Sequence, residues 1–67
     1  MAITLKAARV NKGLSQAKAA ERLEISADTL RRYEQAKAFP DVQMIKKIER
    51  LYGMSYNDLI FLPDSHG

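Results

Sequence analysis

Apolar residues recur at helical spacing along most of this 67-residue chain. No segment of useful length alternates apolar and polar residues, and the β-branched residues are scattered, so strands are not expected. The pattern therefore predicts an all-α fold with five compact helices. Capping residues mark where several of these helices begin and end.

The middle of the chain, residues 14–33, predicts two short helices joined by a tight turn at Glu24-Ile25. Ser15 and Ser26 are suitable N-caps for the two helices. Three residues of the first helix are predicted to face the core. One of them, Ala20, is small enough to allow the two helices to cross steeply and closely. These inward residues are Ala19, Ala20 and Leu23.

The helix that follows Ser26 is predicted to bury Leu30 and Tyr33, which lie three residues apart, and to run to about Gln35. Its outward residues are short, polar or basic: Ala27, Asp28, Arg31 and Arg32. A helix supported on one side by a partner helix, with such side chains on the other, is shaped to enter the major groove of DNA.

The flanking segments predict three further helices that support this pair. One starts near Thr4, ends before Gly13, and turns Leu5, Ala8 and Arg9 inward. Pro40 favours an extended residue before it, so residues 36–40 form a loop. The next helix follows Asp41 and ends at Gly53, with a buried stripe of Ile45, Ile48 and Tyr52.

A short fifth helix is predicted after Ser55, with Asp58 completing an imperfect capping box. The apolar run 59–62 follows it, and residues 63–67 are expected to form a flexible tail. We therefore predict one domain over residues 1–62. The five aromatic residues suggest core packing, with a stacking platform for single strands as the alternative; they are Tyr33, Phe39, Tyr52, Tyr56 and Phe61.

Composition narrows the class of protein. There is no cysteine, and His66 is the single histidine, so no metal site is expected. No catalytic set of residues appears, which predicts a protein without enzymatic activity or cofactor. No apolar run approaches the roughly 20 residues needed to span a membrane, and a cytoplasmic protein of a bacterial or phage-infected cell is expected.

Charge is unevenly distributed along the chain. The net charge is +3, from 11 basic and 8 acidic residues. Residues 1–40 hold eight Lys or Arg against four acids, which gives +4, whereas residues 41–67 hold three against four, which gives −1. A basic N-terminal portion suits a surface that faces nucleic acid.

The chain resembles the phage repressor and Cro type of helix-turn-helix DNA-binding domain, a compact five-helix, lambda-repressor-like fold. The resemblance covers roughly Leu5 to Ile60. It depends on the joint spacing of common residues: Arg9, Gly13-Leu14-Ser15-Gln16, Ala20, Leu23, Ile25-Ser26, Leu30, Tyr33-Glu34, Lys37, Pro40, Gly53 and Asp58-Leu59. Two departures are Glu24 and Ala36, which stand where the family frequently has glycine.

The resemblance implies a set of DNA-binding residues. Gln16 and Lys37 are expected at phosphates, and Arg32 at guanine, where a bidentate contact discriminates by about 1–3 kcal/mol. Asp28 could accept from cytosine N4, or instead hold Arg31 or Arg32 in a fixed rotamer. The full predicted set is Gln16, Ser26, Ala27, Asp28, Thr29, Arg31, Arg32 and Lys37.

The resemblance further implies a structural ion pair between Arg9 and Glu34. For function, we expect sequence-specific binding of double-stranded DNA by a small repressor of phage, plasmid or bacterial origin. A homodimer is expected, with an interface at Leu59, Ile60, Phe61 and Leu62, unless these residues only close the core of the monomer. The alternative is a protein-interaction module, such as an antitoxin or adaptor, with the same fold.

Overall fold

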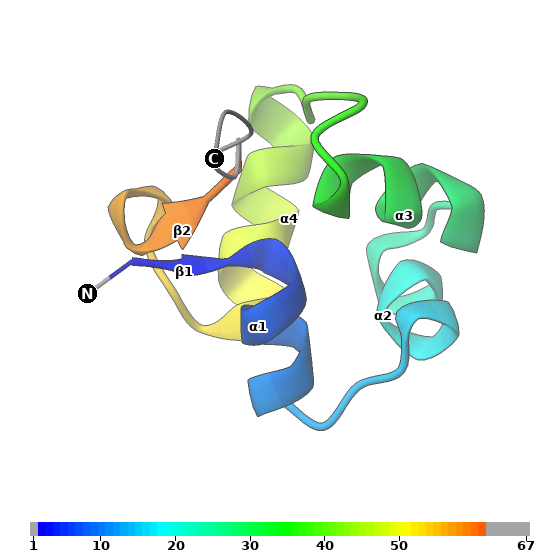
Figure 1. The fold of residues 1–67 in the computed structure, drawn as a ribbon, viewed down its shortest axis with the longest axis horizontal. Coiled ribbons are helices and arrows are strands. Elements are labelled where there is room, and N and C mark those ends of the chain that lie inside the picture. The colour runs from blue at the N-terminus through cyan, green and yellow to red at the C-terminus, as the bar shows by residue number, and fades with distance from the viewer. Residues whose placement is uncertain (1, 62–67) are drawn as a thin grey trace.

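The computed structural model describes residues 2–61, and within them four α-helices pack around one core (Figure 1). The two ends of this segment meet in a two-stranded parallel sheet. The elements in chain order are β1 (Ile3–Thr4), α1 (Leu5–Asn11), α2 (Gln16–Leu23), α3 (Ala27–Glu34), α4 (Val42–Tyr52), the 3-10 helix η1 (Tyr56–Asp58) and β2 (Leu59–Ile60).

Each α-helix begins at the cap residue that the sequence predicts. The side chains of Thr4, Ser15, Ser26 and Asp41 each accept a hydrogen bond from the backbone N–H three residues further on. These bonds satisfy N–H groups that have no partner inside the helix. The starts of the helices are therefore determined by local chemistry.

Each α-helix is followed by a residue in the left-handed conformation. Gly13 and Gly53 have φ values of 71° and 66°, and Glu24 and Ala36 adopt nearly the same conformation, with φ values of 62° and 60°. The residue after each one donates its N–H back into the last turn, as Leu14 does to the Arg9 carbonyl at 3.2 Å. This arrangement is the Schellman motif, which reverses the chain within two residues.

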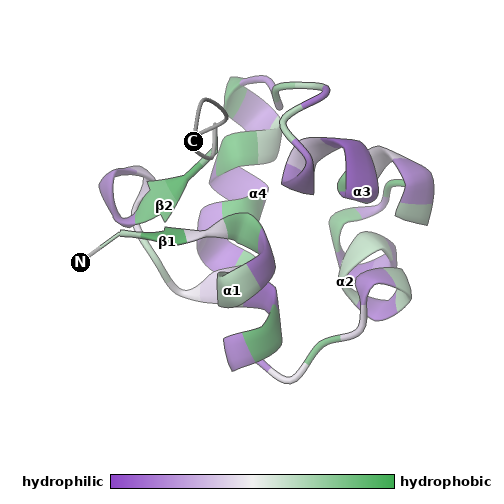
Figure 2. Ribbon diagram, viewed as in Figure 1, coloured by the Kyte–Doolittle hydropathy of each residue, from purple (hydrophilic) through white to green (hydrophobic). Residues whose placement is uncertain are grey.

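The core lies where α2 and α3 cross and where α4 packs against α2. Leu30 of α3 and Ile48 of α4 are completely buried, and Ala20 is 1% exposed at the crossing of α2 and α3. Of the three residues of α4 predicted to be buried, Ile48 and Tyr52 are buried and Ile45 is half-buried. Figure 2 shows green, hydrophobic segments in β1, β2 and α4 and a mainly purple, hydrophilic α3.

The predicted fifth helix is wrong, and so is the absence of strands. Residues 56–58 form only a single 3-10 turn, in which the Ser55 side chain caps no backbone group and donates to Asp58 Oδ2 at 3.1 Å. The Glu49 carboxylate accepts the Tyr56 N–H at 2.6 Å and so ties this turn to α4. The chain then extends, and Leu59 pairs with Ile3.

Two of the five aromatic residues are not in the core. Tyr52 and Phe61 are buried and Tyr33 is half-buried, but Phe39 is 51% exposed and Tyr56 is 46% exposed. Both exposed rings contact Phe61, Phe39 edge-on at 5.7 Å and Tyr56 stacked at 5.2 Å between ring centroids. We call Phe39, Tyr56 and the adjoining edge of Phe61 the aromatic surface.

No helix among residues 2–61 has the length and apolar composition that crossing a bilayer requires.

Candidate nucleic-acid interface

The exposed side of α3 carries the residues that the sequence assigns to the groove. Ala27, Asp28, Arg31 and Arg32 are exposed, while Leu30 on the opposite side is completely buried. Because α2 packs against that buried side, α3 is held firmly with its polar side chains facing outward. Thr29 is half-buried, and its hydroxyl lies 2.9 Å from the hydroxyl of Ser26, the N-cap.

Asp28 binds both arginines of this helix. Arg31 Nη2 donates to one carboxylate oxygen, and Arg32 Nε donates to the other at 3.2 Å. The Arg31 hydrogen bond, followed by that of Arg32, lowers the pKa of Asp28 below its ordinary value. Of the two roles that the sequence leaves open for Asp28, the free protein shows it holding Arg31 and Arg32.

Arg9 and Glu34 are brought together between α1 and α3. Arg9 Nε donates to Glu34 Oε2 at 2.7 Å and Nη2 donates to Oε1 at 3.2 Å, so the pair is bidentate. Arg9 Nη1 also donates to the Leu14 carbonyl at 3.0 Å. The side chains are only 11% and 5% exposed, and the bond to Glu34 raises the pKa of Arg9 above its ordinary value.

Gln16 joins this pair and extends it to a third helix. Its Nε2 donates to Glu34 Oε1 at 3.1 Å, so the side-chain amide is occupied within the protein. Gln16 is also the first residue of α2, and the first N–H groups of a helix have no partner inside it. The backbone at the start of α2 is therefore the part of Gln16 best suited to a phosphate.

A polar hollow of about 250 Å³ opens beside this cluster. Its cationic side chains come from α1 and α3, and its lining residues are Lys6, Arg9, Gln16, Arg31, Glu34 and Gln35. Sequence analysis did not single out Lys6. The signal was available, because Lys6 precedes Arg9 by three residues and residues so spaced share one face of a helix.

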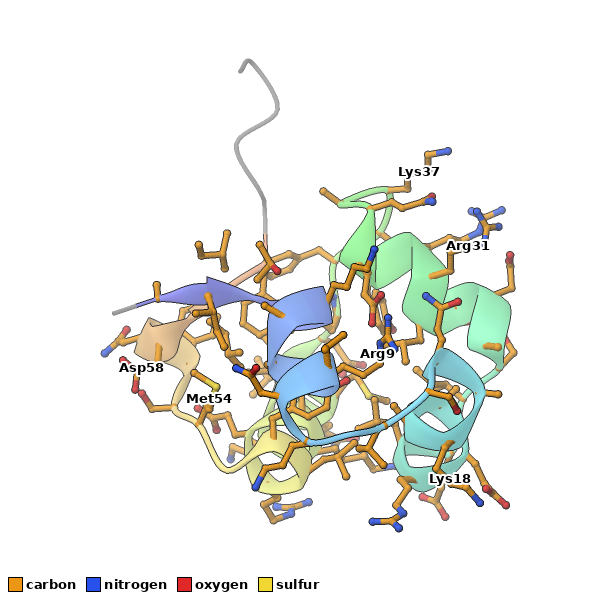
Figure 3. The ribbon with its side chains drawn as sticks, turned by 60° about the horizontal axis from the view of Figure 1, so that its bottom comes forward. Arg9, Lys18, Arg31, Lys37, Met54 and Asp58 are labelled. Atoms are coloured by element: carbon orange, nitrogen blue, oxygen red, sulfur yellow. The ribbon has the colours of Figure 1, made fainter. Side chains whose placement is uncertain are left out.

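Lys37 is exposed in the loop after α3. Figure 3 shows Lys37 and Arg31 projecting from the same side of the molecule, while Arg9 lies further inside. The structure thus gathers the predicted Lys37, Arg31 and the polar hollow on one side. Residues 2–61 hold no group of three acidic, histidine or cysteine side chains able to bind a metal ion.

Two of the four residues of the predicted dimer interface are buried within the monomer. Leu59 and Phe61 are 6% and 5% exposed, because they complete the core beside β1. Ile60 is half-buried, and Leu62 lies outside the described residues. The apolar side chains that do face solvent nearby are Phe39 and Tyr56, beside a hollow of about 400 Å³.

Comparison with protein families matches residues 1–59 to a model described as a helix-turn-helix domain. Searches of curated proteins and of solved structures find no significant match. The match spans most of the chain and includes α2, the turn at Glu24 and α3, whose outward face is described above. The chain therefore belongs to the helix-turn-helix family of DNA-binding domains.

Proposed function

We propose that this protein is a sequence-specific transcriptional repressor of phage, plasmid or bacterial origin that inserts α3 into the major groove of double-stranded DNA. One observation carries the proposal: α3 buries Leu30 completely while its opposite side presents exposed short, polar and basic side chains. The proposal includes no enzymatic activity and places the protein in the cytoplasm.

Base reading is assigned to the exposed side of α3. Arg32 has the length and the planar group to bind guanine O6 and N7, and Ala27 suits the methyl group of thymine. Asp28 either accepts from cytosine N4 or orients the arginines. Ser26 and Thr29, at the start of α3, lie where a recognition helix approaches the bases.

Phosphate contacts are assigned to the surroundings of α3. The backbone at the start of α2, beginning at Gln16, and the exposed Lys37 flank this helix. Lys6 joins them, because it lines the polar hollow next to Gln16 and Arg31. Such contacts set the position of a protein on the duplex but carry no sequence information.

A homodimer on a two-fold operator completes the proposal. Half-sites about one helical turn apart, roughly 34 Å, follow from two copies that each place a helix in successive major grooves. Support comes from the aromatic surface, since exposed aromatic side chains are enriched at interfaces. Ile60 is half-buried at its edge and extends it.

A protein-interaction module is the second candidate, and the same aromatic surface favours it. The dependence of binding affinity on salt concentration distinguishes the two candidates. Binding to DNA weakens steeply as salt rises, because counterions are released from the phosphates. An apolar contact with a protein partner changes far less.

The direct test selects bound duplexes from a random pool and compares the wild type with Arg32→Ala. The expected motif has two-fold symmetry, and the variant relaxes the preference at one position in each half-site. Lys46→Ala is the matched control, because it removes the same charge from an exposed position on α4. If no duplex is enriched over competitor DNA at moderate salt, the proposal fails.

A further inference from the structure

We propose that Asp28 is a specificity-determining residue that restrains Arg31 and Arg32 and thereby weakens binding to DNA of arbitrary sequence. This inference rests on the proposed function. It assigns to Asp28 a role against the wrong DNA, in addition to any contact with the right one.

One carboxylate occupies both cations of the exposed face of α3. Its two oxygens accept from different arginines, Oδ1 from Arg31 and Oδ2 from Arg32. Gln35 fixes the other side of Arg31, because its Oε1 accepts from Arg31 Nη1 at 3.3 Å. Both guanidinium groups are therefore directed along the helix in the free protein.

Among residues 2–61, Asp28 forms ion pairs with these two arginines and with no other cation. The other acid of α3, Glu34, is buried against Arg9. The polar neighbours of Asp28 on the first turn, Ser26 and Thr29, are uncharged and bonded to each other. The exposed face of α3 thus carries two positive charges and one negative charge, and the negative charge lies at the end that leads into the groove.

Solvent exposure makes these ion pairs exchangeable. The side chains of Asp28, Arg31 and Arg32 are 58%, 44% and 57% exposed, and pairs of this kind are held only weakly. A phosphate can take an arginine from Asp28, but the carboxylate is then left close to the negatively charged backbone. Only a base pair with a donor for Asp28, or a guanine for Arg32, compensates for that repulsion.

The consequence is a penalty that depends on the DNA sequence. Contacts with phosphate are the same on every duplex and account for non-specific affinity. By weakening those contacts and leaving base contacts intact, Asp28 increases the ratio of specific to non-specific binding. A negative charge next to phosphates is unfavourable in itself. The restraint of Arg31 and Arg32 explains why Asp28 stands at this position.

The test measures the affinity of the wild type and of Asp28→Asn for a random-sequence duplex and for the selected operator, over a range of salt. Asparagine keeps the shape of the side chain and removes its charge. For random DNA we expect an increase in affinity of about fivefold at 0.1 M salt, and a slope of log K against log salt that is steeper by about 1. Operator affinity should rise less, so the specificity ratio falls.

Two controls isolate the restraint from the change in net charge. Glu21→Gln removes one negative charge from a comparable exposed pair with Lys18 on α2 and should leave random-duplex affinity within about twofold of the wild type. In the background of Arg31→Gln and Arg32→Gln, the gain from Asp28→Asn should shrink to about twofold, because no arginine remains to be released and only the repulsion between the carboxylate and the phosphates is left.

The inference is overturned if Asp28→Asn binds random DNA with the affinity and salt slope of the wild type. It is also overturned if the gain is undiminished without the arginines, or if the variant only loses preference at one operator position. If the wild type shows no salt-sensitive affinity for any duplex, the proposed function itself is wrong. The wild-type measurement thus tests that proposal, and the comparison of variants tests this one.

Discussion

Glu34 is the residue at which the polar groups of all four helices converge. It lies on α3 and accepts from Arg9 of α1 and Gln16 of α2. Tyr52 of α4 lies within reach of its charge: burial, and then the charge of Glu34, raises the pKa of the Tyr52 hydroxyl. Because these groups are largely buried, the loss of one partner leaves the others unpaired away from water.

Glu34→Gln is expected to destabilise the fold strongly. The variant leaves the guanidinium of Arg9 buried without its counter-charge, and breaking a buried pair costs about 3–5 kcal/mol. Urea unfolding followed by circular dichroism measures the free energy of unfolding. Glu21→Gln, at the exposed pair with Lys18, should change it by less than about 0.5 kcal/mol. A loss below about 1 kcal/mol in Glu34→Gln would show that the pair is not structural.

Tyr52 makes the stability of the fold sensitive to alkaline pH. Burial, and then the charge of Glu34, raises the pKa of Tyr52 from 10.0 to about 12, while the charge of Arg9 opposes this shift. The unfolded chain loses this proton first, so the contribution of Tyr52 to stability is complete below pH 10. It falls as the pH rises from 10 to about 12, by roughly 2–3 kcal/mol.

Tyr52→Phe should remove that part of the alkaline loss. Lysines and other tyrosines titrate in both proteins, so the difference between their pH–stability curves isolates Tyr52. At neutral pH the variant should be at least as stable as the wild type, because the Tyr52 hydroxyl is buried without a hydrogen-bond partner among residues 2–61. Parallel curves above pH 10 would contradict the assignment.

At the scale of elements, the helix ends decide how α3 is presented. Four helices end in the same chain reversal, two of them at glycine and two at Glu24 and Ala36. A side chain in the left-handed conformation costs roughly 1 kcal/mol. Glu24 offsets part of this cost through its exposed contact with Lys47, at 3.0 Å.

Ala36→Gly should stabilise the fold. Ala36 has a φ of 60°, which glycine adopts without a steric penalty, and its methyl group makes no polar contact. We expect an increase of up to about 1 kcal/mol in the free energy of unfolding, measured by thermal or urea denaturation. Ala17→Gly, at an exposed helical position in α2, should lower it by about 0.5–1 kcal/mol. A destabilised Ala36→Gly would show that the side chain contributes packing instead.

At the scale of the whole molecule, the structure presents two candidate binding surfaces. One surface is the exposed face of α3 with the polar hollow, and the other is the aromatic surface at β2 and the loop after α3. Figure 1 shows that loop between α3 and the start of α4. A partner bound at the aromatic surface would therefore sit next to the loop that follows α3.

Combining Phe39→Ser and Tyr56→Ser should weaken the proposed dimer, measured by sedimentation. Affinity for a two-fold duplex should fall about tenfold or more, while affinity for a single half-site stays unchanged, because only the linkage between two sites is lost. Val10→Ser is the control, since Val10 is 57% exposed at the far end of α1. If the double variant dimerises as strongly as the wild type, the aromatic surface is not the dimer interface.

Much of this architecture could be read from the chain. The caps at Ser15 and Ser26 and the inward position of Leu30 follow from chemistry within five residues, whereas the left-handed backbone at Glu24 is implied by the family resemblance. Such local preferences act before the chain is compact, and for that reason their pattern is visible in sequence. The sequence alone therefore determined α1 to α4, the division of α3 into two sides, and the residues assigned to DNA other than Lys6.

The tertiary structure decided everything that depends on distant partners. It pairs Ile3 with Leu59 in strands too short to show a period, and it replaces a fifth helix by one 3-10 turn. It also commits the Gln16 amide to Glu34 and leaves Phe39 exposed. These outcomes are choices among competing contacts across the whole chain, and only the packed core selects among them.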